Sequence, residues 1–333
     1  MKTTYLLLCL LGIGSVSGAG QTKQPQKIGD FIESTSYNEH RRNATRSLQY
    51  TPDGDDFVCI NGKNRFTRAL YGSHTAFRLE TSDRPVFAAY TKENPKHICF
   101  KLQTSGGTVA LDSTEHCESR YTAGRRSYSL SDPAFGGGSL SITTWALPDK
   151  EGAIWQFNAR NFKEFHPVLL ASISEIRNSK LNRNGDMGAD PADSFEAPLQ
   201  PQQLQSFPVQ IDGTLYILLE NQELRTLTTA EGENLFKKAE AARSETASRI
   251  RIETPDPYFN TLGGTLAMAA DGIWDGEVWL HGAIGWRMPL SGWRAAYTGD
   301  VLGWHDRART HFNAYAASQV TEAVSYTHLT LPT

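Results

Sequence analysis

The sequence has no excess of basic residues: 33 Lys and Arg stand against 36 Asp and Glu, for a formal net charge of -3 over 333 residues. Nucleic-acid binding depends on cations that neutralise phosphates, so we expect no nucleic-acid partner. The sequence also lacks, beyond residue 20, any apolar run near the roughly 20 residues that a spanning helix needs. We therefore expect no transmembrane segment.

Cysteine is scarce, with 4 residues in the chain. Cys9 lies in the apolar amino-terminal run, which leaves Cys59, Cys99 and Cys117, and an odd number does not indicate a disulfide framework. Histidines lie near two of these cysteines, but the tight CxxC or HxxxH spacing of a metal site is missing. We predict buried thiols and no metal at these positions.

The amino-terminal residues are typical of an export signal. Residues 1–20 place one lysine before a short apolar run and then small residues that suit a signal peptidase. We expect cleavage near residue 20 and a soluble protein that is periplasmic or extracellular. Residues 21–49 are polar and aperiodic, which favours a tether or a first strand.

Residues 50–228 read as an all-β sandwich. Short apolar or alternating runs such as FVCI, VFAAY, HICFKL and SLSITTWAL are separated by DG, NG, GG and DP turn signals. The spacing is too irregular for a repeat architecture. We predict two packed antiparallel sheets.

One stretch interrupts this pattern. Residues 177–207 are rich in Asn, Asp, Gly, Pro and Gln, which predicts an irregular loop. Asp186, Asp190 and Asp193 could offer oxygen ligands to calcium, although their spacing does not match an EF-hand loop. We expect a solvated loop and no cofactor, with bound calcium as the alternative.

After residue 229 the apolar period changes from two to about 3.6, which predicts helices. The first is a linker helix running to about residue 249, with Leu235 and Ala239 on one face. A second covers residues 257–273, with Phe259 and Leu266 on its apolar face. We expect a third to begin near Asp300, with Ala308, Phe312, Tyr315, Ala316 and Val320 on its inner face.

Between the second and third helices we expect a loop of about 25 residues, a length that is usually functional or disordered. The neighbourhood holds five of the seven tryptophans. Indole faces stack on sugar rings while carboxylates, Arg and His bond the hydroxyls. The pattern therefore predicts a saccharide site, and the alternative is that the tryptophans fill a core between helices. The predicted substrate-binding residues are Trp274, Trp279, His281, Arg287, Trp293, Arg294, Trp304 and His305.

Two segments carry a family resemblance. DPYFNTLGGTLAMAADGIW and GWRAAYTGDVLGW, after a sandwich and a linker helix, are similar to the start of bacterial six-hairpin glycosidases, whose catalytic domain is an (α/α)6 toroid. The sandwich resembles the amino-terminal domain of large exported proteins of polysaccharide-degrading bacteria. The resemblance implies a supersandwich-like domain at residues 50–228 and the first helices of a toroid at residues 229–323.

The resemblance also implies hydrolysis of a glycosidic bond through two carboxyl groups, most often with inversion. We predict Asp275 or Glu277 as the general acid, because flanking tryptophans could hold a carboxyl protonated. Asp300 is the third candidate carboxylate, as a ligand of sugar hydroxyls together with Arg294. Alternatively, Asp300 caps the third helix.

Two other functions stay open. A polysaccharide lyase could use a similar toroid with His281, His305 or Tyr297 as the base, beside a cation that neutralises a uronate. A non-catalytic glycan-binding protein would use the same tryptophans without needing a pair of carboxyl groups. The sequence names neither the sugar nor the oligomeric state.

The last ten residues, 324–333, read VSYTHLTLPT. They reverse-translate codon by codon into what looks like a sequencing adapter, and they break the helical period of the preceding residues. We expect the natural reading frame to continue past residue 323 into further helices, and the chain as written to be catalytically inert. The last helix should then expose an apolar face that includes Phe312, Tyr315 and Ala316.

Overall fold

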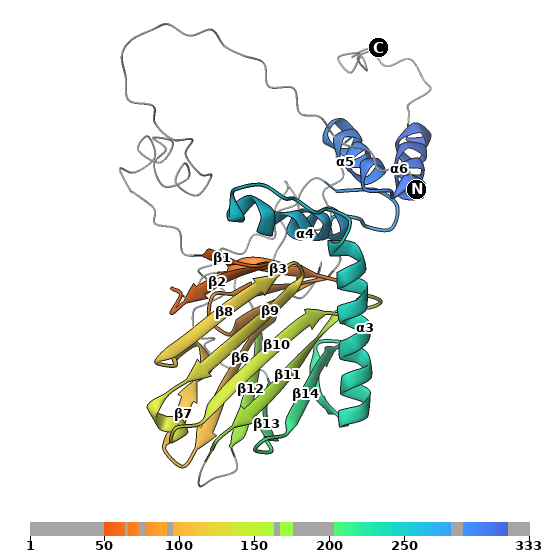
Figure 1. Cartoon of the computed structure of the whole chain (residues 1–333). Helices are drawn as coiled ribbons and strands as arrows, with labels where there is room; N and C mark the ends of the chain where they lie inside the picture. The colour runs from red at the N-terminus through yellow and green to blue at the C-terminus, as the bar shows by residue number, and fades with distance from the viewer. Residues whose placement is uncertain are drawn as a thin grey trace, which may run out of the picture. The chain divides into compact units, whose positions relative to one another are not determined.

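The computed structural model describes residues 50–63, 66–72, 77–91, 96–162, 167–175, 203–280 and 289–318. Over these ranges the chain forms two antiparallel sheets and then four helices (Figure 1). This confirms the predicted mainly β portion followed by helices. The predicted signal peptide, the polar tether, the calcium candidates Asp186, Asp190 and Asp193, and the segment 324–333 lie outside the described residues.

Sheet A has eight strands in the order β1-β2-β8-β9-β10-β11-β14-β15. Neighbouring strands pair antiparallel throughout, and most follow each other directly in the chain. Its strands are β1 (Thr51–Asp53), β2 (Asp56–Ile60), β8 (His116–Thr122), β9 (Arg125–Ser131), β10 (Ser139–Ala146), β11 (Gly152–Arg160), β14 (Thr214–Glu220) and β15 (Glu223–Leu227).

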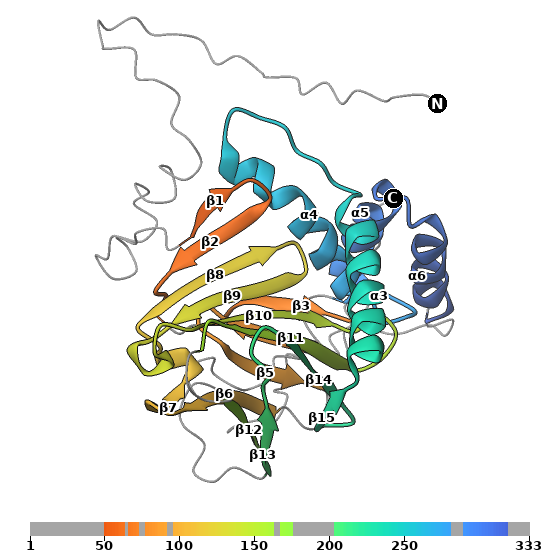
Figure 2. The same ribbon diagram turned by 60° about the horizontal axis from the view of Figure 1, so that its bottom comes forward.

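Sheet B has seven strands in the order β13-β12-β6-β5-β4-β3, with β7 also paired to β6. Its strands are β3 (Phe66–Tyr71), β4 (Arg78–Ser82), β5 (Val86–Tyr90), β6 (Lys96–Thr104), β7 (Gly107–Ala110), β12 (Val168–Glu175) and β13 (Gln203–Pro208). Figure 2 shows the two sheets as separate layers. Two short 3-10 turns, Leu111–Ser113 and Pro133–Phe135, lie between strands.

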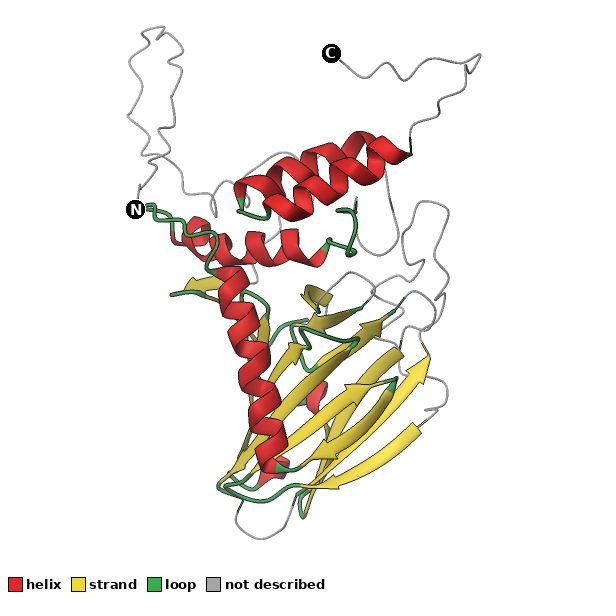
Figure 3. Cartoon of the chain, turned by 90° about the vertical axis from the view of Figure 1, so that its right-hand side faces the viewer, coloured by secondary structure: helices red, strands yellow, loops and turns green. Residues whose placement is uncertain are grey.

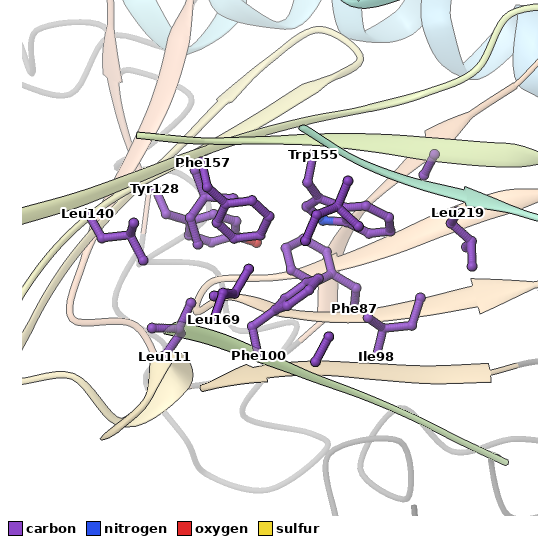
Figure 4. Packing of buried hydrophobic residues seen from close by; sticks show 14 of the residues in the cluster. Phe87, Ile98, Phe100, Leu111, Tyr128, Leu140, Trp155, Phe157, Leu169 and Leu219 are labelled. Carbon is purple, nitrogen blue, oxygen red and sulfur yellow. The ribbon is translucent and has the colours of Figure 1, made fainter. Parts of the chain in front are cut away.

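The inner faces of the two sheets form one apolar core, as alternation along the strands requires. On β10, Leu140 and Ile142 are buried, whereas Ser141 between them is partly exposed. Phe87 of sheet B meets Trp155 of sheet A edge to face, with ring centroids 5.4 Å apart, a favoured aromatic geometry. Figure 4 shows these rings in the middle of the sandwich.

The predicted linker helix is α3 (Thr229–Ala247), and it packs on the outer face of sheet A. It begins with a capping box: the Thr228 hydroxyl accepts from the Glu231 N–H, and the Glu231 carboxylate accepts from the Thr228 N–H. Ala239 is buried against the outward side chains of the sheet, among them Trp145. The helix therefore leaves the sandwich without a flexible linker (Figure 3).

The second helix, α4 (Pro257–Gly272), begins at the predicted proline but buries a different face from the predicted one. Phe259 and Leu266 are exposed, while Ala267 and Met268 are buried. The reason is close packing on the sandwich through glycine: a Cβ added to Gly264 would lie 3.0 Å from the Cβ of Ala123. Small residues let this helix approach the β8–β9 turn, whereas Phe259 and Leu266 point away from the sandwich.

The predicted long loop and third helix need correction. Residues Pro289–Val301 form helix α5, and helix α6 follows at His305–Ala317. Asp300 therefore lies in the last turn of α5, and Trp304 occupies the N-cap position of α6 without a side-chain cap bond. Phe312, on the apolar face that we expected to be uncovered in the chain as written, is exposed, and the neighbouring His311 is fully buried. None of the helices in the described ranges is long and apolar enough to cross a membrane.

A buried histidine on the outward face of sheet B should make the stability of the fold depend on pH. His97 is buried, and burial lowers the pKa of its imidazole to about 4. The unfolded chain takes up this proton near pH 6.5 and the folded chain only near pH 4, so stability falls as the pH drops through this window. Lowering the pH from 7 to 4 should therefore reduce the free energy of unfolding of the His97→Gln variant by about 3 kcal/mol less than that of the unchanged protein. Urea titrations at each pH measure this difference.

The exposed His116 provides the matched control for this measurement. Burial raises the pKa of the Glu80 carboxyl on the same face, so Glu80 changes stability with pH in the direction opposite to His97. This contribution is the same in both proteins and cancels when variant and unchanged protein are compared at each pH. His116→Gln should leave the pH dependence unchanged. Equal pH dependence in His97→Gln and His116→Gln would contradict the assignment.

Candidate functional site around the tryptophan turn

A tight turn follows α4 and carries two of the predicted carboxylates. Trp274 and Trp279 form an antiparallel bridge, and the Asp275 N–H donates to the Val278 carbonyl at 3.0 Å. The Asp275 carboxylate accepts from the N–H of Glu277 at 3.0 Å and of Val278 at 2.7 Å. This is an Asx-type turn in which the aspartate fixes the backbone. Asp275 therefore positions Glu277, which is exposed at the tip of the turn.

Trp279 lies at the centre of a cluster of buried aromatic side chains. It is 1% exposed, and its indole N–H donates to the Ala270 carbonyl at 3.0 Å. Its backbone N–H donates to Nδ1 of His311 at 3.0 Å, which ties the turn to α6. Its ring centroid lies 4.7 Å from that of Trp274 and 6.4 Å from that of Trp304. A sugar ring could not reach its faces unless the turn moved, so the structure favours a packing role for Trp279.

Trp304 is nearly buried between two guanidinium groups. The Arg249 Cζ lies 5.0 Å from its ring centroid and the Arg307 Cζ lies 4.8 Å from it. Arg307 also lies over Trp274 at 5.6 Å and pairs with Asp271 at 2.6 Å. These cation–π contacts join the residues that follow α3 and α4 to the start of α6. Arg307 thus contacts Asp271, Trp274 and Trp304, although the sequence analysis did not select it.

The structure brings two predicted site residues into direct contact. His305 Nδ1 lies 2.6 Å from Asp300 Oδ1, and their side chains are 69% and 55% exposed. The tight connection Leu302–Gly303 between α5 and α6, with φ +84° at Gly303, allows this approach. A carboxylate bonded to Nδ1 orients the ring and leaves Nε2 directed elsewhere, as in proton-transfer pairs. The pair could bind a hydroxyl or move a proton.

The structure describes the remaining predicted site residues only in part. His281 and Arg287 lie outside the described residues. Trp293 and Arg294 belong to helix α5, but only their backbone is described. The described members of the predicted site thus divide into buried residues, Trp274, Trp279 and Trp304, the half-buried Asp275, and exposed ones, Glu277, Asp300 and His305.

Sequence reasoning missed Arg249, Arg307 and His311. Arg307 and His311 lie four residues apart in HDRARTHF, a spacing that places both on one helix face. This spacing was the only available signal, and it does not distinguish a buried histidine from a solvated one. Their partners are 32 to 36 residues away in the chain and come close only through the turn at residues 274–279.

No cluster of three or more metal-ligating side chains occurs within the described ranges. Cys59 and Cys117 are buried, as predicted, and Cys99 is half-buried. Burial raises the pKa of the Cys99 and Cys117 thiols to about 12. Thiols rather than thiolates are present at neutral pH, and the thiolate is the form that binds metals and attacks electrophiles.

Residues 95–250 match the model of a family described as a domain of unknown function, DUF4450. The match begins just before β6 and extends to the end of α3, so it covers most of the sandwich and the linker helix. The turn at residues 274–279 and helices α5 and α6 lie beyond it. No curated protein matches the sequence.

Proposed function

We propose that this chain belongs to an exported glycoside hydrolase, in which the sandwich supports the first helices of an (α/α)6 catalytic domain. The observation that carries the proposal is the order of elements: a two-sheet sandwich, a capped helix packed on its outer face, and then paired helices. The segments that resemble six-hairpin glycosidases correspond to α4 with the residues that follow it, and to most of α5 with its connection to α6. Export through residues 1–20 is part of the proposal.

Within this proposal Glu277 is the first candidate for the general acid. Asp275 already accepts two backbone N–H groups of the turn, and that bonding commits its carboxylate to local structure. Glu277 stands at the tip, where a substrate could reach it. Asp300 and His305 would bind sugar hydroxyls, because a carboxylate and an imidazole together offer several donors and acceptors.

The Asp300–His305 contact also keeps a second function in view. A polysaccharide lyase needs a base that removes a proton next to a carboxylate group, and a histidine oriented by an aspartate is one such base. A uronate substrate would then need a cation or Arg nearby to neutralise its charge. The same pair therefore serves either reaction, and the products distinguish them.

The test is incubation of the full-length protein with neutral and uronate-containing polysaccharides. Hydrolysis releases reducing ends without ultraviolet absorbance, and this is the result we expect. Unsaturated products that absorb in the ultraviolet would replace the proposal with a lyase. Binding without either product would identify a glycan-binding protein.

A further inference from the structure

Two arginines lie over one buried tryptophan where helix α3 packs on sheet A. The tryptophan is Trp145 of β10, which is 1% exposed. The Cζ of Arg125, on the neighbouring strand β9, lies 5.7 Å from its ring centroid, and the Cζ of Arg243, on α3, lies 5.2 Å from it. The sheet and the helix therefore each bring one guanidinium to the same ring.

Three N–H donors of this group have no acceptor in the described part of the chain. They are the indole Nε1 of Trp145 and the Nε atoms of Arg125 and Arg243, and all three atoms are buried. The ends of the guanidiniums are partly used. Arg125 donates to the Thr122 hydroxyl at 2.7 Å, and Arg243 donates to the Ala123 carbonyl at 3.1 Å and to the hydroxyl of the following serine at 2.8 Å. Buried donors are nearly always paired, and unpaired ones commonly mark a bound water or ion.

The charges around Trp145 favour an anion over water. Burial lowers the pKa of Arg243, and the positive charge of Arg125 lowers it further, so the two guanidiniums repel each other. Asp56 lies 3.8 Å from Arg125 Nη2, but it also pairs with Arg120 at 3.3 Å. Glu240 and Asp56 partly offset the repulsion, although neither forms an ion pair with Arg243 within the described ranges. Two like charges that share one distant carboxylate are stabilised by a bound anion.

We propose that Arg125, Arg243 and Trp145 bind one tetrahedral oxyanion, a sulfate or a phosphate, between sheet A and α3. All the unpaired groups are donors and two of them are cationic, which suits a dianion that carries only acceptors. A carboxylate matches the fork of a single guanidinium, whereas these donors come from a strand, a ring and a helix.

The site suits a free ion rather than an anionic group on a polymer. The Arg125 side chain is 29% exposed and Trp145 is buried, so a small ion reaches the donors more readily than a chain of sugars does. The bound ion would hold α3 on the sheet. This inference does not depend on catalysis by the helical segment.

Thermal melting of the protein in sodium sulfate, sodium phosphate, sodium glucuronate and sodium chloride at equal ionic strength tests the proposal. We expect sulfate or phosphate to raise the melting temperature until the site is saturated. Stabilisation by salt exclusion from the protein surface does not saturate in this way. Glucuronate and chloride should give a smaller rise without saturation.

The variants Arg125→Gln and Arg243→Gln each remove one cationic donor. The Kd for the oxyanion should increase about tenfold or more in each, as expected for the loss of one charge-assisted hydrogen bond. Arg160→Gln is the matched control, because Arg160 is an exposed arginine at the end of β11 on the same face of sheet A. It should leave the Kd unchanged.

Three results would overturn the proposal: a rise in melting temperature that does not saturate, an equal Kd in the unchanged protein and in both arginine variants, or an equal saturable rise with glucuronate. Isothermal titration calorimetry of the unchanged protein with sulfate and with phosphate keeps the test decisive if a variant does not fold. Absence of binding heat with both ions would refute the site.

Discussion

Replacing Trp279 by alanine is expected to lower the free energy of unfolding of the helical segment by about 3–5 kcal/mol, the usual cost of removing a buried tryptophan. The indole is 1% exposed and contacts Trp274 and Trp304. Its N–H also bonds the Ala270 carbonyl, which would lose its partner. Urea titration followed by the helical circular dichroism signal measures the loss.

Tyr297 on α5 is the control for this experiment, because its side chain is 57% exposed. Tyr297→Ala should change the free energy of unfolding by no more than about 0.5 kcal/mol. Unchanged stability of Trp279→Ala, combined with weaker binding of oligosaccharides, would contradict the packing role and restore the sugar-stacking role that the sequence suggested.

Replacing Gly272 by alanine is expected to separate α4 from the sandwich. A Cβ at this position would overlap the ring of Tyr71, so either the helix or the ring must move. Overpacking of this kind costs about 1–3 kcal/mol. Thermal melting and limited proteolysis of the α3–α4 connection report the loss of stability and of docking.

The double variant Gly272→Ala/Tyr71→Ala identifies the cause. If the clash is responsible, the double variant should be more stable than the sum of the two single changes predicts, by about 1 kcal/mol or more. Ala269→Leu, at an exposed position on the same helix, controls for changes in helix propensity. Additive effects of the two changes would show that Tyr71 does not limit this packing.

The sequence predicted β10, β11 and β14 well, because each strand contains a run of apolar residues that is buried, either in the core or under α3. It did not reveal β8 and β9. On β9 the inward position next to Tyr128 is Arg126, which is fully buried and donates to the Ser82 carbonyl at 2.8 Å and to the Tyr50 hydroxyl at 2.8 Å. A charged residue on the core face breaks the apolar alternation by which strands are recognised.

The sequence did not predict helix α5, and the reason differs from that for β8 and β9. PLSGWRAAYTGDV contains two glycines and no clear apolar stripe, so its sequence favours a loop. The structure forms a helix there because α6 packs against it. The Asp300–His305 pair depends on the position of that helix end, which local sequence does not determine.

The sequence predicted which residue types gather at the candidate site. It did not predict which of them are buried and which are exposed. Tryptophans, carboxylates and histidines do gather around the end of α4 and the start of α6, as the sequence indicated. Which of them are buried depends on His311 and Arg307, whose contacts join segments more than 30 residues apart. Hence the sequence selected Trp279 for sugar binding, while the structure places it inside the helical core.

The central claim is carboxylate-dependent cleavage of a glycosidic bond, and the most direct test is the rate of reducing-end release by Glu277→Gln. Since a general acid contributes about 10²–10⁴-fold, the rate in the full-length protein should fall at least 10²-fold with the melting temperature unchanged. Asp306→Asn, on the exposed side of α6, is the matched control and should keep full activity. Full activity of Glu277→Gln on a polysaccharide that the unchanged protein hydrolyses would contradict the account.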